Sequence, residues 1–146
     1  MNVITSFKEK KREKEMKYER KMLRDLSLEK LHKKANESFR LFYPDDRALP
    51  SVVEDGCMDM AIEAYLLGAS YSRFGYYGEP MEKVKKRSAQ QEKYLADALF
   101  EFLCFWGNHG DTSRAEVLYD TCECYISYWW LEGFEKGKKR WRLKLH

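Results

Sequence analysis

The sequence predicts an all-α fold: a single-domain bundle of about five helices with a charged peripheral N-terminal helix. Apolar residues recur every three or four positions along most of the 146 residues, and period-two alternation is confined to a few short stretches. Only three prolines and eight glycines occur, and Ser or Asp precedes most of the helical patterns. At this length one domain, 1–146, is expected.

The first helix is expected from a capping-box pattern at Ser6 and Glu9 to about Asp25. Lysines, arginines and glutamates follow one another along it, and apolar residues are few. Because such a segment has little apolar surface to bury, residues 1–26 are expected to lie at the periphery, in solvent or on a partner.

Ser27 is expected to cap a second helix that reaches about Phe42. Pro44 should end this helix, and residues 43–50, which contain two prolines, form a predicted loop. The apolar residues of the helix share one face: Leu28, Leu31, Ala35, Phe39 and Phe42.

The third predicted helix opens at Ser51, where Glu54 completes another capping box, and it is apolar on nearly every side. A helix of this kind must lie in the middle of a bundle, so other helices are expected to surround it. Residues 75–78, Gly-Tyr-Tyr-Gly, should then form a tight turn. Small residues on the main face of the helix allow a neighbouring helix to approach closely: Ala61, Ala64 and Gly68.

Pro80 suits the first position of the fourth helix, which keeps a long apolar stripe as far as Trp106. Residues 107–110 contain two glycines and should stop it. Asp111 or Ser113 is expected to cap the fifth helix, with a third capping-box pattern from Ser113.

The fifth helix is rich in aromatic residues and is expected to fray into a basic tail at residues 136–146. Trp129 and Trp130 are adjacent, so they cannot share one face of a helix. One of them is therefore expected to be exposed, or buried against a second chain.

Charge is divided along the chain. Residues 1–40 hold 13 Lys and Arg against 7 Asp and Glu, residues 136–146 hold 6 against none, and the 95 residues between hold 8 against 17, so net charges of +6, +6 and −9 sum to +3. Basic ends on an acidic body can bind that body, a second copy of the chain, or an outside polyanion. The sequence leaves these three possibilities open.

The N-terminal charges are followed by no apolar run, and no apolar run reaches the roughly 18 residues of a membrane span, so a cytoplasmic protein is expected. The cysteines, Cys57, Cys104, Cys122 and Cys124, stand in apolar helical contexts and are interpreted as small buried side chains. They form no CxxC pair and no cluster with histidine. The sequence therefore predicts no metal, no cofactor and no catalytic cysteine.

Glu63 is the candidate buried carboxylate, because apolar residues stand on both sides of it in the run AIEAYLLG. Such a group can hold a metal or act as a base. A di-iron site, however, would need Glu-x-x-His motifs from two helices, and the chain has one, at Glu29 and His32. The favoured interpretation is structural: Glu63 pairs with Arg87 or Arg73, or points to solvent.

The candidate binding surface combines the tyrosine turn with the basic tail. Cations that alternate with a tryptophan can neutralise phosphates or lie on an anionic surface. The alternative is that the cations suit the carboxyl end of a helix and the aromatic rings belong to the core. The residues of this surface are Arg73, Tyr76, Tyr77, Lys138, Lys139, Arg140, Trp141 and Arg142.

Two stretches, GCMDMAIEAYLLGASYSRFGYYGEPM (56–81) and YWWLEGF (128–134), resemble the uncharacterised YbaK-type family of small proteins from Bacillus and its relatives. A tRNA-editing family of the same name is unrelated. The resemblance covers most of the chain, and the blocks AIEAYLLG and FGYYGE are its specific part. It implies a bacterial cytosolic setting and a helical fold, and it implies no activity, cofactor or catalytic residue.

The leading functional hypothesis is a small non-enzymatic interaction or regulatory protein that self-associates as a dimer and contacts a protein partner. The long apolar stripe of the fourth helix and the surplus of aromatic residues motivate the dimer. The first alternative is binding of nucleic acid or an anionic surface through the basic ends. The second alternative is an enzyme with a site near Glu63 and the 75–78 turn.

Overall fold

The computed structural model describes residues 3–43, 49–107 and 112–144; for residues 3–5 and 112–113 it describes the backbone only. Within these ranges the protein is all-helical, as predicted, and contains no strand. It has seven α-helices and one 3-10 turn rather than five helices, because two predicted helices are each divided in two. The elements are α1 (Val3–Arg24), α2 (Leu28–Phe39), η1 (Arg40–Phe42), α3 (Ser51–Ser70), α4 (Ser72–Tyr76), α5 (Met81–Arg87), α6 (Ala89–Trp106) and α7 (Thr112–Arg142).

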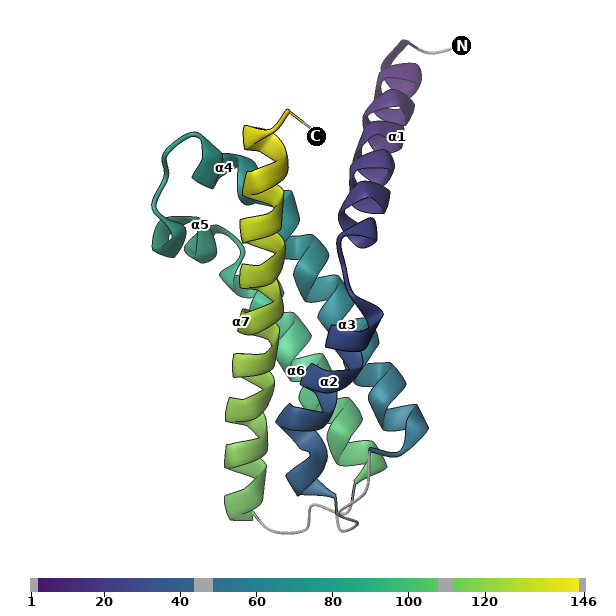
Figure 1. The fold of residues 1–146 in the computed structure, drawn as a ribbon, viewed down its shortest axis with the longest axis vertical. Coiled ribbons are helices and arrows are strands. Elements are labelled where there is room, and N and C mark those ends of the chain that lie inside the picture. Colours follow the sequence, from purple (N-terminus) through teal and green to yellow (C-terminus); the bar gives the residue numbers. More distant parts are fainter. Residues whose placement is uncertain (1–2, 44–48, 108–111, 145–146) are drawn as a thin grey trace.

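The bundle is elongated, and α7 runs along nearly its whole length (Figure 1). α3 lies beside α7 and runs in the same direction, while α6 and α2 run the opposite way and pack around this pair (Figure 1). The first half of α1 projects beyond the bundle, and the two termini lie at the same end (Figure 1). Residues 7–17 of α1 are all exposed, because no other element covers them.

Two glycines set the distance between α3 and α7. A Cβ atom on Gly68 of α3 would lie 1.9 Å from the carbonyl oxygen of Trp130. A Cβ atom on Gly133 of α7 would lie 1.8 Å from the carbonyl oxygen of Tyr65. The two backbones therefore touch, which confirms the close approach predicted from Gly68; Gly133, its counterpart, was not predicted.

α3 is buried on most of its circumference, and eight of its 20 residues are buried. The expectation that other helices surround it on every side is wrong in one respect: a narrow stripe faces solvent. The stripe follows one helical face because α2, α6 and α7 cover the other sides. Its exposed residues are Ser51, Val52, Asp55, Asp59, Glu63 and Ser70.

The long helix predicted from Pro80 to Trp106 is broken at Ser88, which separates α5 from α6. Ser88 is fully buried, and its hydroxyl accepts a hydrogen bond of 2.9 Å from the indole Nε1 of Trp130. Its φ of −109° and ψ of 14° lie outside helical geometry, so the chain turns here. Pro80 precedes α5 as its N-cap instead of occupying the first helical position.

Three of the predicted caps differ in the structure. α1 begins at Val3, so Ser6 lies inside the helix. Pro50 precedes α3, and the carboxylate of Glu54 contacts α2 instead of closing a capping box. α7 begins at Thr112, before Ser113, while Asp111 lies outside the described residues, as do Pro44 and residues 108–110.

The Ser27 cap is confirmed: its side chain accepts a hydrogen bond of 3.2 Å from the Lys30 N–H. The α-helix that follows ends at Phe39, and the remaining residues to Phe42 form the 3-10 turn η1. The predicted fraying into a basic tail is wrong as well, because α7 stays helical to Arg142.

Trp129 and Trp130 are both fully buried, so neither is left for solvent or a second chain. The two side chains are buried in two separate hydrophobic clusters. Trp129 belongs to the main core of α2, α3, α6 and α7. Trp130 stacks on Phe134 at 5.0 Å in a smaller cluster with Val84.

We expect the α3–α7 contact to fail first under substitution. Gly68→Ala and Gly133→Ala each place a methyl group against a backbone carbonyl that cannot move aside, and each should lower the free energy of unfolding by about 3 kcal/mol. Chemical denaturation measures the loss. Gly56→Ala is the matched control, since its Cβ would meet only the Phe102 ring, which can shift. Equal losses at all three positions would contradict the assignment.

Candidate functional site

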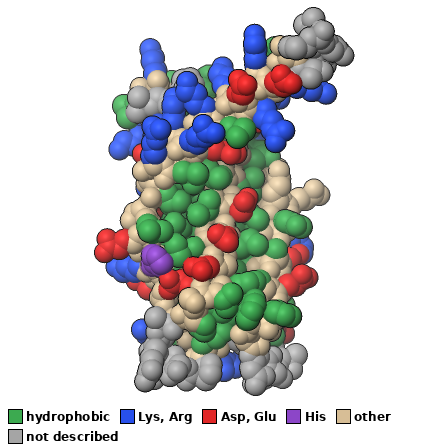
Figure 2. Space-filling model, turned by 90° about the vertical axis from the view of Figure 1, so that its right-hand side faces the viewer, with side chains coloured by type: hydrophobic (Ala, Val, Ile, Leu, Met, Phe, Trp, Pro, Cys, Tyr) green, Lys and Arg blue, Asp and Glu red, His purple; other side chains and the backbone are tan. Residues whose placement is uncertain are grey.

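Most of the cations converge at one end of the molecule. α1 carries nine lysines and arginines against four glutamates, and it lies beside the last turns of α7 (Figure 1). Figure 2 shows lysine and arginine side chains gathered at this end, while acidic side chains lie among hydrophobic ones on the body. We call this region the basic end; it comprises residues 7–24 of α1, α4, and residues 136–144 at the end of α7.

The base of α1 is fixed to the bundle by buried contacts. The Tyr18 hydroxyl lies 3.2 Å from both the carbonyl oxygen of Ala69 and the hydroxyl of Ser72. Burial raises the pKa of this phenol above its ordinary value. One turn further on, Met22 is fully buried, and its carbonyl accepts a hydrogen bond of 2.8 Å from the Tyr65 hydroxyl.

An ion pair joins the ends of the two basic helices. The Arg140 Nε donates to the Asp25 carboxylate at 2.7 Å, and another guanidinium nitrogen donates to the Lys21 carbonyl at 2.9 Å. The Lys136 ammonium donates to the Asp25 carbonyl at 2.7 Å. Only 15% of the Arg140 side chain is exposed. Arg140 was expected on the binding surface; it instead holds α1 against α7, because Asp25 faces it across the junction.

The tyrosine turn is the end of a short helix. Gly75 and Tyr76 belong to α4, and Gly78 follows with a φ of +102°, a conformation that glycine adopts without strain. The Glu79 N–H donates to the Phe74 carbonyl at 3.0 Å and the Gly78 N–H to the Gly75 carbonyl at 3.1 Å. These two hydrogen bonds define a Schellman cap, which fixes the direction of the adjoining tyrosine side chains.

Tyr76, Tyr77 and Trp141 form one aromatic cluster, although the turn and the tail lie far apart in the sequence. The Tyr76 ring stacks on the Trp141 ring at 6.1 Å, and the Tyr77 ring lies 6.2 Å from it. The two tyrosine rings meet edge to face at 5.1 Å. Tyr77 remains 74% exposed and Tyr76 41% exposed. The cluster therefore presents fixed aromatic rings to solvent.

Cations flank this cluster on both helices. Arg73 precedes Tyr77 by one helical turn, and its guanidinium lies 5.2 Å from the Phe74 ring. Lys138 is half-buried, with its ammonium 5.3 Å from the Phe134 ring. The structure thus brings Tyr76, Tyr77 and Trp141 into contact, with Arg73 and Lys138 on the same two helices. Lys139 and Arg142 are exposed on the last turns of α7, and Arg140 lies in the junction with α1.

Glu63 is exposed, so the expectation of a buried carboxylate is wrong. The apolar neighbours Ile62 and Leu66, on which the prediction of burial depended, are themselves only half-buried. Neither arginine proposed as its partner pairs with it: Arg87 donates to the Glu79 carboxylate at 3.0 and 3.1 Å, and Arg73 packs on Phe74. Among the described residues Glu63 has no ion pair, and it points to solvent.

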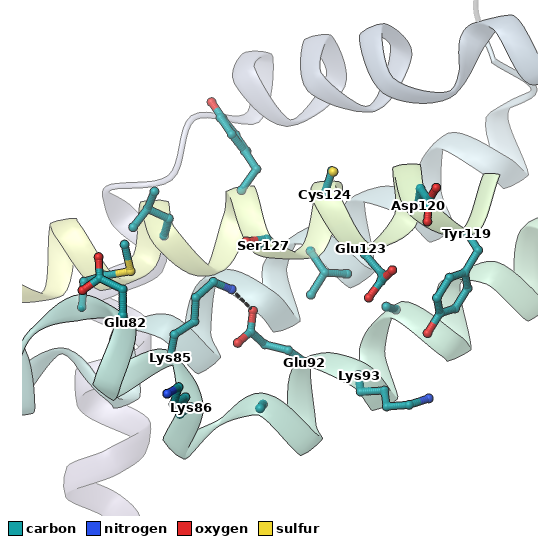
Figure 3. Close-up of a pocket in the computed structure, with 16 residues that line it drawn as sticks. Glu82, Lys85, Lys86, Glu92, Lys93, Tyr119, Asp120, Glu123, Cys124 and Ser127 are labelled. Carbon is teal, nitrogen blue, oxygen red and sulfur yellow. Dashed lines mark hydrogen bonds and ion pairs between the residues drawn. The ribbon is translucent and has the colours of Figure 1, made fainter. Parts of the chain in front are cut away.

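A groove of about 950 Å³ lies between α5, α6 and α7. Figure 3 shows Lys85 and Glu92 facing each other across its floor, where they form an ion pair. Burial raises the pKa of Glu92, against the opposing effect of Lys85. At one side, the Tyr119 hydroxyl and the Lys93 ammonium donate to the Asp97 carboxylate at 2.7 and 2.9 Å. Lys85, Glu92 and Lys93 therefore have partners within the chain, while Glu82, Lys86, Asp120 and Glu123 also line the groove.

The cysteines offer no activated thiol in the described part of the chain. Cys57 and Cys122 are fully buried, and burial raises the pKa of both; for Cys57 it reaches about 12. A raised pKa keeps a thiol protonated and unreactive at neutral pH. No group of three or more His, Cys, Asp or Glu that would suit a metal ion occurs within the described residues.

One polar cluster was missed in the sequence. The carboxylate of Glu54 contacts the His32 Nδ1, and it accepts a hydrogen bond of 2.7 Å from the Asn36 amide. The Asn36 side-chain oxygen accepts from the Leu49 N–H at 3.0 Å. These contacts join α2 to the start of α3, so the cluster is structural. The spacing of His32 and Asn36, one turn apart on α2, was its only sequence signal.

The fold and the site together define a small helical protein with one end rich in cations and aromatic rings. The whole chain, residues 1–146, matches the family described as "Protein of unknown function (DUF2521)". It is 32% identical over 146 residues to the uncharacterized protein YbaK of Bacillus subtilis strain 168, and the match covers 99% of each chain. The chain therefore belongs to this family.

This membership confirms the resemblance seen in residues 56–81 and 128–134. No solved structure matches the chain. Within the described residues, no helix has both the length and the apolar character required to cross a bilayer.

The burial of the thiols predicts a graded reactivity. A thiol reagent such as Ellman's reagent at pH 8 should modify the exposed Cys124 quickly, whereas Cys57 and Cys122 should react only after unfolding. Cys124→Ser should remove the fast phase and leave the thermal stability unchanged. Fast modification of a buried thiol in this variant would contradict the packing described above.

Proposed function

We propose that this protein is a non-enzymatic, cytoplasmic interaction protein that binds a polyanionic partner through its basic end. One observation carries the proposal: two cation-rich segments from opposite ends of the sequence meet at one end of the bundle, beside an exposed aromatic cluster. The acidic residues of the body lie elsewhere (Figure 2). The charge of the molecule is therefore separated in space as well as along the chain.

The electrostatics of the basic end favour an outside partner. Like charges held close together repel one another, and the fold neutralises only some of them. Arg140 and Lys136 engage Asp25, whereas Lys139, Arg142 and Lys144 are exposed, as are the α1 cations from Lys8 to Lys17. A polyanion that neutralises such a cluster releases its own counterions, which supplies most of the binding free energy.

The non-enzymatic part of the proposal rests on the remaining candidates for chemistry. The thiols of Cys57 and Cys122 are held protonated, and Lys85 and Glu92 of the groove form an ion pair with each other. Glu63 lies exposed on α3, and the tyrosine turn contacts Trp141 of α7 instead. An enzymatic site built from Glu63 and the turn therefore finds no support in the geometry.

Binding of fluorescein-labelled heparin, followed by fluorescence anisotropy, tests the proposal. We expect the logarithm of the affinity to fall linearly with the logarithm of the salt concentration. Lys139→Glu combined with Arg142→Glu should weaken binding and make that slope shallower by about two. Lys33→Glu combined with Lys93→Glu, on the body, makes the same change in net charge and should leave binding nearly intact. Absence of binding at low salt would refute the proposal.

A second candidate function is self-association as a homodimer. The apolar stripe that motivated it is internal, since Ala96, Leu99 and Leu103 are buried in the core. A different observation favours it: Phe105 is 79% exposed and Trp106 48% exposed at the end of α6. Their rings lie 5.3 Å apart, and the Trp106 ring lies 6.5 Å from that of Phe102, which packs at Gly56 of α3. The same patch on a second copy offers a self-complementary apolar surface.

Light scattering across micromolar to millimolar concentrations tests the dimer. The wild-type chain should show twice the monomer mass at the higher concentrations, and Phe105→Ser combined with Trp106→Ser should keep it monomeric. Phe7→Ser, at a similarly exposed aromatic side chain on α1, is the control and should leave the dimer intact. A wild-type monomer over the whole range would exclude this candidate.

A further inference from the structure

We infer that the polyanion is a single-stranded nucleic acid, held by stacking of an unpaired base on the Tyr77 ring while the neighbouring cations contact its phosphates. This inference rests on the function proposed above, because it names the partner of the same basic end. A positively charged surface binds any polyanion, so the choice of one class of polyanion must come from the aromatic cluster.

The Tyr77 ring has the properties of a stacking platform. It is 74% exposed, and its backbone is fixed by the Schellman cap at Gly78. Its contacts with the Tyr76 and Trp141 rings hold it against α7. A ring that is already ordered loses little conformational entropy when a base stacks on it. Proteins that bind single strands without sequence preference stack successive bases on aromatic side chains beside a positively charged surface.

The cations stand where the phosphates of such a strand would run. Arg73 lies one helical turn before Tyr77, and Lys138 lies one turn before Trp141. Arg142 is exposed in the last turn of α7. Phosphates on either side of the stacked base can therefore reach cations from both α4 and α7. The exposed cations of α1, at the same end of the molecule, extend this positive surface (Figures 1 and 2).

Two other polyanions fit these features less well. The bases of a duplex are already stacked on each other and leave no free face for Tyr77. An anionic bilayer favours a continuous apolar face on an amphipathic helix. The last turns of α7 instead present Lys139 and Arg142, with Leu143 as their one exposed aliphatic residue in the described segment.

The test compares oligonucleotides that differ only in their bases. Fluorescence anisotropy would measure binding of oligodeoxythymidine of about 12 nucleotides, within the usual site size, and of an abasic strand with the same number of phosphates. We expect the thymidine strand to bind about tenfold more tightly. Tyr77→Ala should remove this preference and leave abasic-strand and heparin binding unchanged, and Tyr77→Phe should retain it. Tyr94→Ala, at a tyrosine 72% exposed on α6, is the matched control and should have no effect.

The outcomes separate this inference from the proposed function. Equal binding of the thymidine and abasic strands, with salt-dependent heparin binding intact, would overturn the inference and leave polyanion binding standing. Tighter binding to phosphatidylglycerol vesicles than to the thymidine strand, lost in Tyr77→Ala, would also overturn it in favour of a bilayer. No binding of heparin or of either strand at low salt would refute both.

Discussion

The backbone contact between α3 and α7 determines where every other element lies. Gly68 and Gly133 let the two helices touch, and each packs against a carbonyl of the other helix. At this separation the side chains on either side interlock, as where the Tyr125 hydroxyl donates to the Cys57 carbonyl at 2.9 Å. α2 and α6 then cover the pair, and α4 is carried to the end of α7. Because α3 and α7 run in parallel, α4 reaches the last turns of α7, where Tyr76 and Tyr77 meet Trp141.

The junction between α1 and α7 gives the basic end its arrangement. Near Asp25 the two helices are joined by Arg140 and Lys136, and the half-buried Tyr18 contacts α3 and α4. On the N-terminal side of Tyr18, residues 7–17 of α1 are exposed and no part of the bundle covers them. Repulsion between the cations of α1 and those of α7 favours separation of the two helices. A few short-range contacts at the base therefore hold two positively charged helices side by side.

Sequence reasoning succeeded where the pattern was local. The apolar circumference of α3, its small residues and the Ser27 cap are readable from neighbouring positions. It failed where one distant partner decides the structure. The break at Ser88 depends on the indole of Trp130, 42 residues away, and the place of Arg140 depends on Asp25, 115 residues away. For the candidate site, the residue types were predictable from the sequence, but the meeting of Tyr77 with Trp141 required the fold.

The opposed orientations of Trp129 and Trp130 have a consequence for how the protein melts. The main core and the smaller cluster that contains Phe134 are separate sets of side chains, yet consecutive residues of one helix are embedded in both. Loss of helical geometry at this point would withdraw a large ring from each cluster at once. The main core and the smaller cluster are thereby expected to unfold together, although their buried side chains form separate sets.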